Sequence, residues 1–174
     1  MSKLSIVAAL WMLSGCQAVV HPPLTTVSQV DLPRFMGDWY VIANIPTFIE
    51  KGAHNAVESY RLDADGSIAT TFTFRANGYD GELKRYTPRG FVVPGSGNGH
   101  WGMRFVWPFK SEYRIMYLDE AYAQTIIGRT KRDYVWIMAR TPTIPEADYQ
   151  RLVDLLAREG YDVSKLQKVP QRWP

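Results

Sequence analysis

The sequence predicts an all-β protein, an eight-stranded antiparallel barrel of the up-and-down type with one α-helix packed outside it near the C-terminus. Three observations predict this fold. Short segments of alternating apolar and polar residues follow one another between residues 37 and 140, with turns between them. No helical segment separates them, so the sheet has no parallel βαβ units and its strands run antiparallel. One amphipathic helical segment follows the last strand.

The chain has the size and composition of one globular domain with a substantial core, since 46% of its 174 residues are hydrophobic. Its net charge is +3, and the Lys and Arg residues are scattered among acidic residues instead of forming a stripe. We therefore expect no nucleic-acid partner.

The first predicted strand carries a large side chain near its start. Gly37 permits a sharp turn, Trp39 needs a core and a partner for its N–H, and the apolar run that follows ends at Pro46. The other seven strands are expected over residues 55–62, 67–75, 79–94 with an interruption near Pro88, 101–105, 113–117, 122–129 and 134–140. Eight strands close a barrel that has room for side chains or for one small ligand.

A single helix is predicted after the last barrel strand. Residues 143–146 have the spacing of a capping box, and Gly160 is expected to end the helix. One face of this helix is apolar, and it carries Tyr149, Leu152, Val153 and Leu156. Such a stripe packs against another element, here the barrel wall. Residues 167–173 are expected to add a last short strand.

The N-terminal residues differ from the rest of the chain. Lys3 precedes an apolar run over residues 6–13, which is typical of a secretory signal and too short to span a membrane. Residues 13–16, Leu-Ser-Gly-Cys, resemble the bacterial lipobox, in which the cysteine is acylated and becomes the new N-terminus. Cys16 is the only cysteine, so no internal disulfide can form. The alternative is a plain signal peptide followed by an incidental cysteine.

These features divide the chain into a lipoprotein signal peptide over residues 1–15, a lipidated tether over 16–29 and the barrel domain over 30–174. The tether has no periodicity, and it contains two consecutive prolines. Gln17 follows the cysteine, whereas an aspartate there marks retention in the inner membrane. The lipoprotein resemblance therefore implies a lipid anchor through Cys16 on the periplasmic side of a bacterial outer membrane.

Three local motifs resemble those of the lipocalin family. Residues 37–39, Gly-Asp-Trp, match the G-x-W motif that opens the first lipocalin strand. Tyr122 matches the second motif, usually Thr-Asp-Tyr, although Glu120 and Ala121 replace its first two residues, and Arg140 matches the third. The resemblance implies that Arg140 lies across the motif tryptophan at the closed end of the barrel, where a guanidinium over an indole gains cation–π energy. The residues expected to have this structural role are Gly37, Trp39, Tyr122 and Arg140.

A closer resemblance is to the bacterial subgroup of this family, the Blc-like outer-membrane lipoproteins. It rests on residues 60–66, 108–109, 132–144 and 158–163, and it runs from about Val30 to the C-terminus. The resemblance implies a protein that binds fatty acids and lysophospholipids and is linked to maintenance of the cell envelope under stress.

The side chains expected to face the barrel interior are mostly aromatic or apolar. Such positions either fill a core or line a cavity, and the lipocalin resemblance favours a cavity. Arg140 fixes the parity of the last strand and so places Trp136 and Tyr134 inside, toward the mouth. Glu58 shares the parity of its strand's inward residues and is a further candidate, unless a change of register leaves it in solvent. The other candidates are Tyr60, Phe72, Phe74, Trp101, Met103, Phe105, Tyr113, Ile115, Tyr117 and Met138.

We expect a binding protein and not an enzyme. No residue is assigned a catalytic role, no cofactor is expected, and His21, His54 and His100 are too far apart in the sequence to suggest a metal site. The expected partners are a fatty acid or lysophospholipid ligand and the membrane, and a homodimer is left open. One alternative is an envelope enzyme acting on a lipid or isoprenoid, which would need convergent titratable groups in the cavity. Another is a filled barrel that serves as an interaction module.

Overall fold

The computed structural model of the chain describes residues 22–106 and 108–173. The predicted signal peptide over residues 1–15, Cys16 and the first part of the predicted tether lie outside the described residues. Within the described part, no helix is both long and apolar enough to cross a membrane.

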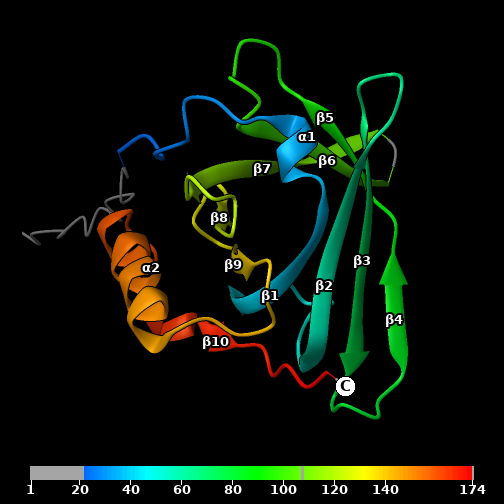
Figure 1. Cartoon of the computed structure of the whole chain (residues 1–174), viewed down its shortest axis with the longest axis vertical. Coiled ribbons are helices and arrows are strands. Elements are labelled where there is room, and N and C mark those ends of the chain that lie inside the picture. The colour runs from blue at the N-terminus through cyan, green and yellow to red at the C-terminus, as the bar shows by residue number, and fades with distance from the viewer. Residues whose placement is uncertain (1–21, 107, 174) are drawn as a thin grey trace, which may run out of the picture.

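Antiparallel strands wrap into a closed barrel, as predicted (Figure 1). Successive strands are neighbours in the sheet, and β1 also pairs with β9, which closes it. β4 and β5 both pair with β3 and together form one wall strand, so the barrel has eight. The strands are β1 (Gly37–Ile45), β2 (Ala53–Leu62), β3 (Ile68–Ala76), β4 (Leu83–Tyr86), β5 (Arg89–Val92), β6 (His100–Val106), β7 (Phe109–Leu118), β8 (Gln124–Gly128) and β9 (Val135–Ala139).

The interruption expected near Pro88 separates β4 from β5. β4 pairs with residues 72–75 of β3, whereas β5 pairs with residues 68–69. Proline has no N–H to donate to a neighbouring strand, but its carbonyl still accepts a hydrogen bond from Thr70 N–H at 3.1 Å. The break therefore costs the sheet little at this point.

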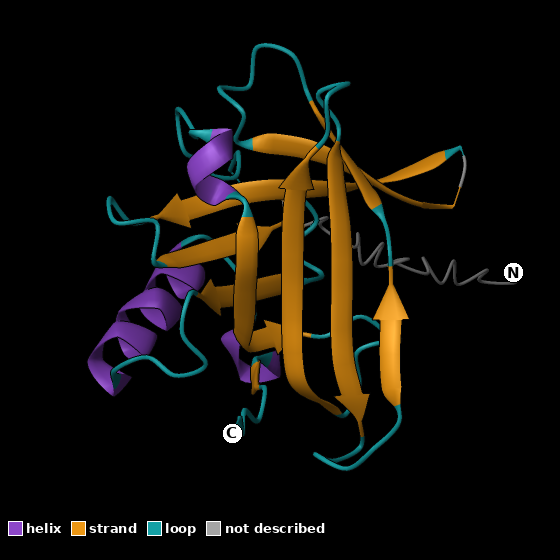
Figure 2. Ribbon diagram, turned by 45° about the vertical axis from the view of Figure 1, so that its right-hand side comes forward, coloured by secondary structure: helices purple, strands orange, loops and turns teal. Residues whose placement is uncertain are grey.

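One long helix, α2 (Glu146–Arg158), packs on the outer face of the barrel (Figure 2). Leu152 and Leu156 are fully buried in an outer core that includes Ile126 of β8 and Ile137 of β9. Gly160 follows the helix with φ of +85°, a conformation that glycine adopts without strain. The chain then passes through the 3-10 turn η1 (Val163–Lys165) to the predicted last strand, β10 (Gln167–Lys168), which pairs with β1.

The predicted capping box over residues 143–146 was wrong. The N-cap is Pro145, and no side chain caps the helix. A capping box would have required Thr143 at the N-cap, two residues earlier, but the helix begins only after Pro145. Thr143 instead uses its carbonyl to accept the hydroxyl hydrogen of Thr141 at 2.7 Å.

A short helix, α1 (Leu32–Phe35), and aromatic side chains plug the closed end of the barrel. Trp39 is fully buried and donates its indole N–H to the Phe35 carbonyl at 2.9 Å. The Arg140 guanidinium lies 3.9 Å from the centre of the Trp39 ring. Its Nη2 atom donates to the carbonyls of residues 34–36 at 2.9–3.0 Å. The contact expected between Arg140 and Trp39 is therefore present.

Gly37 and Tyr122 complete this closed end. Gly37 has φ of +93°, and a Cβ there would lie 3.4 Å from Nη1 of Arg140. Tyr122 has φ of +58°, its hydroxyl accepts the Asp31 N–H at 2.9 Å, and its carbonyl accepts Nε of Arg140 at 3.3 Å. Gly37 thus leaves room beside the arginine, and Tyr122 is hydrogen-bonded both to the arginine and to Asp31.

The N-terminal segment packs on the barrel from Pro22 onward. Arg132 donates to the Pro22 carbonyl at 2.7 Å, and Leu24 is buried in the outer core beside α2. Val27 donates its N–H to the Ile115 carbonyl at 2.9 Å. Residues 22–29 of the predicted tether over 16–29 thus pack against the barrel, where Leu24 and Val27 bury apolar surface.

Candidate ligand-binding cavity

The open end of the barrel, opposite Trp39, holds a cavity of about 530 Å³. Its walls come from strands β2, β3, β4, β6, β7 and β9 and from the loops that follow β1 and β8. This volume lies within the roughly 300–1,000 Å³ of typical small-molecule sites. The barrel is therefore not filled by its own side chains.

Many of the residues predicted to face inward line this cavity. Glu58 is among them, so the alternative that places its side chain in solvent is wrong. Phe105 is 55% exposed and therefore lies at the rim. The predicted residues that line the cavity are Glu58, Phe72, Met103, Phe105, Tyr113, Tyr134 and Trp136.

Other predicted residues are buried in the inner core and do not line the cavity. Tyr60 and Trp101 pack against Phe35 of the closed end, with ring centres 5.7 and 5.4 Å from it. Phe74 is covered by Tyr86, whose ring stacks on it at 6.2 Å. Alternation along a strand gives the face of a residue but not its depth. The buried residues of this group are Tyr60, Phe74, Trp101, Ile115 and Met138.

Tyr117 was predicted to face inward, and this prediction was wrong. The register between β7 and β8 shifts between Ile115 and Tyr117, as at a β-bulge. Met116 and Tyr117 consequently both belong to the outer core, and the Tyr117 hydroxyl accepts a hydrogen bond from Arg151 of α2 at 3.0 Å. One extra residue in the strand thus moved this tyrosine from the cavity to the helix side.

The loop between β1 and β2 supplies lining residues that the strand pattern could not identify. Glu50 is 6% exposed, and its carboxylate accepts the Thr47 N–H at 3.0 Å and the Trp136 indole N–H at 3.2 Å. Phe48 is 82% exposed at the mouth. Loops have no strand periodicity, and a buried acid beside exposed Phe48 leaves no pattern in the sequence. The lining residues not predicted are Thr47, Phe48, Ile49, Glu50, Tyr86, Thr87, Pro88, Ser111, Glu112 and Arg129.

Residues 30–171 match the sequence family described as the lipocalin-like domain. The chain belongs to the lipocalin family. It is 30% identical over 169 residues to the outer membrane lipoprotein Blc of Citrobacter freundii, covering 95% of this chain and 93% of that protein. It is 31% identical to temperature-induced lipocalin-1 of Arabidopsis thaliana, covering 85% and 83%. This lipocalin is therefore similar to the Blc subgroup over most of its length.

Solved structures agree with the fold of this lipocalin. Insecticyanin from the tobacco hornworm superposes with a TM-score of 0.65 at 17% identity, covering 86% of this chain and 85% of that one. The cockroach allergen Per a 4 superposes with a TM-score of 0.64 at 20% identity, covering 85% and 92%. At such low identity, these neighbours support the barrel fold alone.

Two carboxyl groups of the lipocalin cavity hold protons more tightly than they would in water. Burial, and secondarily the charge of Glu50, raises the pKa of Glu58 to about 8. Burial also raises the pKa of Glu50, against hydrogen bonds from Thr47 and Trp136 that lower it. Burial and the neighbouring Glu58 raise the pKa of the Tyr113 hydroxyl. Glu58 is therefore mostly uncharged at pH 7.

Two charged groups, Glu112 and Arg129, line the cavity of this lipocalin near its rim. The Glu112 carboxylate accepts hydrogen bonds from Arg114 at 2.5 Å and from the Thr130 N–H at 2.7 Å. Burial raises the pKa of Glu112, but these hydrogen bonds lower it further, so that it lies below its ordinary value. Arg129 lies 3.5 Å from the Asp133 carboxylate, but its buried Nε atom has no hydrogen-bond partner among the described residues.

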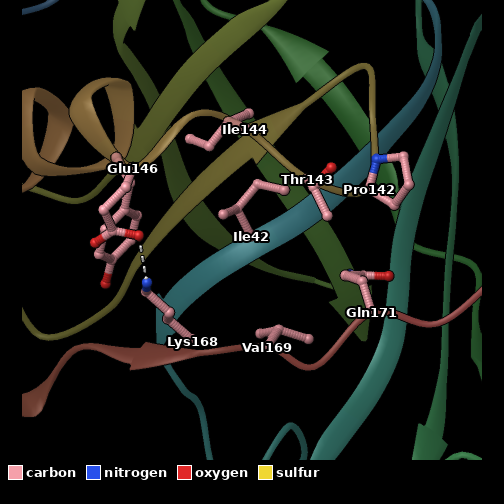
Figure 3. A pocket seen from close by; sticks show the side chains of 9 residues that line it. Ile42, Pro142, Thr143, Ile144, Glu146, Lys168, Val169 and Gln171 are labelled. Atoms are coloured by element: carbon pink, nitrogen blue, oxygen red, sulfur yellow. Dashed lines mark hydrogen bonds and ion pairs between the residues drawn. The ribbon is translucent and has the colours of Figure 1, made fainter.

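A second, smaller pocket of about 180 Å³ lies on the outer face of this lipocalin, between β1, β10 and the start of α2 (Figure 3). Ile42 and Ile144 form part of its wall, and a 2.9 Å ion pair between Glu146 and Lys168 lies at its edge. Among the described residues, no group of three or more His, Cys, Asp and Glu side chains is placed to hold a metal ion. The larger cavity is thus the site with room for a ligand.

Proposed function

We propose that this lipocalin binds a single long-chain lipid in its barrel cavity and stores or transports it in the bacterial cell envelope. Fatty acids and lysophospholipids are the proposed ligand classes. One observation carries the proposal, namely an open cavity of about 530 Å³ whose lining is mainly apolar and aromatic. The relatives named outer membrane lipoprotein Blc support the envelope location.

The free energy of binding comes from removing the lipid chain from water. Each buried methylene contributes about 0.8 kcal/mol, so a long chain reaches about micromolar affinity or better after the entropic cost of association. Phe72, Met103 and Trp136 supply the apolar surface that the chain contacts. A chain with few methylenes should accordingly bind much more weakly.

The same proposal places the protein at the periplasmic side of the outer membrane, held by acyl chains on Cys16 after removal of residues 1–15. The lipobox resemblance and the names of the Blc relatives support this location. Several acyl chains hold a protein firmly, whereas one chain alone binds marginally.

A second candidate function is catalysis on a lipid, because Glu58, Tyr60 and Tyr113 do converge. The Tyr60 hydroxyl donates to Glu58 and lies 2.7 Å from the Tyr113 hydroxyl. Stoichiometric retention of unchanged lipid supports binding, whereas turnover of that lipid supports an enzyme. The filled-barrel alternative predicts no cavity, and the observed one argues against it.

Mass spectrometry of lipids that co-purify with the protein from its own host tests the proposal directly. Binding predicts about one long-chain lipid per protein, and competition with palmitic acid should displace it. Absence of bound lipid together with no binding of added palmitic acid would overturn the proposal. Size-exclusion chromatography of the same sample decides between a monomer and a homodimer.

A further inference from the structure

The innermost part of the cavity is polar, although the plug beneath it is aromatic. We call Glu58 and Tyr113 the floor of the cavity, because their cross-strand neighbours Trp39 and Trp101 are fully buried in the plug. The Tyr113 ring stacks on Trp101, with ring centres 4.8 Å apart and planes 5° from parallel. Tyr60 lies beside the floor, also within the inner core.

The hydrogen bonds of the floor leave one carboxyl oxygen without a protein partner. The Tyr60 hydroxyl donates its hydrogen to Oε2 of Glu58. In the 2.7 Å contact between the two tyrosine hydroxyls, Tyr113 is therefore the donor and Tyr60 the acceptor. No described residue donates a hydrogen bond to Oε1 of Glu58. Glu58 and Tyr113 both line the cavity, so this oxygen and a lone pair of Tyr113 remain for a ligand.

Glu50, the other buried acid of the cavity, differs from Glu58 in its hydrogen bonds. Its Oε1 atom accepts the Trp136 indole N–H, and its Oε2 atom accepts the Thr47 N–H. Both oxygens of Glu50 therefore have protein partners. The floor is where the lining offers an unpartnered acid oxygen beside a hydroxyl.

The opposite end of the cavity carries two exposed aromatic side chains. Phe48 and Phe105 lie at the mouth and are 82% and 55% exposed. Two charged lining residues lie near them. Glu112 pairs with Arg114, whereas Arg129 lies 3.5 Å from Asp133 and its buried Nε atom has no hydrogen-bond partner among the described residues. The most exposed apolar side chains of the cavity thus lie at its outer end, and its unpartnered acid oxygen lies at its inner end.

We infer that a single-chain lipid binds with its polar end inward, placing a terminal carboxyl or hydroxyl group on Glu58 and Tyr113 and its chain toward Phe48 and Phe105. This inference rests on the proposed lipid-binding function and specifies the ligand's orientation and head-group class. A carboxyl or hydroxyl head group has a proton to donate to Tyr113, whereas a phosphodiester is ionised at neutral pH and has none. Of the two proposed ligand classes, fatty acids are therefore favoured over lysophospholipids.

The protonation state of the floor agrees with this orientation. With a pKa of about 8, Glu58 carries a proton at pH 7 and can donate it in a hydrogen bond to an oxygen of the ligand. A fatty acid that binds in its protonated form accepts this hydrogen and donates its own to the lone pair of Tyr113, so no two negative charges oppose each other. The other charged groups that line the cavity are Glu50, Glu112 and Arg129.

Two labelled fatty acids of equal chain length test the orientation on the unlipidated Cys16→Ser chain. One carries a dansyl group at its terminal methyl end, and the other has its carboxyl group converted to a dansyl amide. Head-inward binding predicts that the first binds more tightly by about tenfold, the scale of one or two hydrogen bonds. Equal or tighter binding of the second would overturn the inference while leaving the proposed function intact. Failure of both probes while unlabelled palmitic acid binds would also overturn it, whereas failure of all three removes the proposed function itself.

A matched pair of tyrosine variants tests the floor residues. Tyr113→Phe and Tyr117→Phe each remove one hydroxyl from β7, the first from the floor of the cavity and the second from the outer core beside α2. Palmitic acid and hexadecanol should bind about fivefold to tenfold more weakly to Tyr113→Phe and unchanged to Tyr117→Phe. Equal effects of the two variants, with both proteins folded by circular dichroism, would contradict the assignment.

Discussion

Trp136 donates its indole N–H to Oε1 of Glu50 at 3.2 Å, joining β9 to the loop after β1 at the cavity wall. Glu50 is 6% exposed, and burial raises its pKa, while the hydrogen bond from Trp136 opposes that rise. A tryptophan that lines the ligand site thus also holds the loop that carries Phe48. Ligand contact and loop position are coupled through one side chain.

Trp136→Phe should separate these two roles. The variant keeps an aromatic ring but leaves Oε1 of Glu50 without its donor, so we expect a loss of about 1–3 kcal/mol in unfolding free energy. Urea denaturation measures this loss. Long-chain lipid should still bind by calorimetry, but the tryptophan fluorescence change on binding should shrink. An unchanged fluorescence response in Trp136→Phe would show that this residue does not report the ligand.

Changes at the closed end should affect stability and not ligand affinity. Trp39→Ala should lower the unfolding free energy by about 3–5 kcal/mol, as other buried large-to-small changes do. Arg140→Ala removes the cation–π contact and the donors to residues 34–36, so it should also destabilise the fold. Palmitic acid titrated into folded Arg140→Ala should bind as in the parent protein. Weaker binding by that folded variant would contradict a purely structural role.

The stability of the protein should fall as pH rises from about 4.5 to about 8. In this range the folded state keeps a proton on Glu58 that the unfolded chain has released. The unfolding free energy should therefore fall by up to about 1.4 kcal/mol per pH unit, and this slope should end above the folded-state pKa. Glu58→Gln should flatten most of the slope, leaving a part due to Glu50, whose pKa is also raised. Denaturant titrations at several pH values measure the unfolding free energy. Equal slopes against pH in the parent protein and in Glu58→Gln would disprove the assignment of this pH dependence to Glu58.

Cys16→Ser should release the protein from the membrane. The variant lacks the thiol that the lipobox resemblance marks for acylation, so it should lose labelling by radioactive fatty acid and move to the soluble periplasmic fraction. Cell fractionation and metabolic labelling check this outcome. A variant that still sediments with outer membrane and carries label would refute the anchor at Cys16.

The fold could be predicted because the periodicity of each strand is a local property of the sequence. The lining of the cavity could not, because it depends on contacts between residues far apart in the chain. Alternation placed Phe72 and Met103 on the inner face correctly, but it could not tell that Phe74 would be covered by Tyr86. A single bulge near Met116 reversed the side of Tyr117 without a glycine or proline to mark it. Glu50 is recognisable as a lining residue only once the loop that carries it has met Trp136.

The docking of Pro22 beside Arg132 restricts how an anchored barrel can turn. Arg132 belongs to the loop between β8 and β9, the same loop that brings Arg129 and Tyr134 to the cavity mouth. Pro22 follows Cys16 by six residues, so the connecting segment spans at most about 20 Å. With acyl chains on Cys16, the cavity mouth would stay within a short distance of one membrane leaflet. A lipid leaving that leaflet would therefore encounter the cavity at a high effective concentration of the protein.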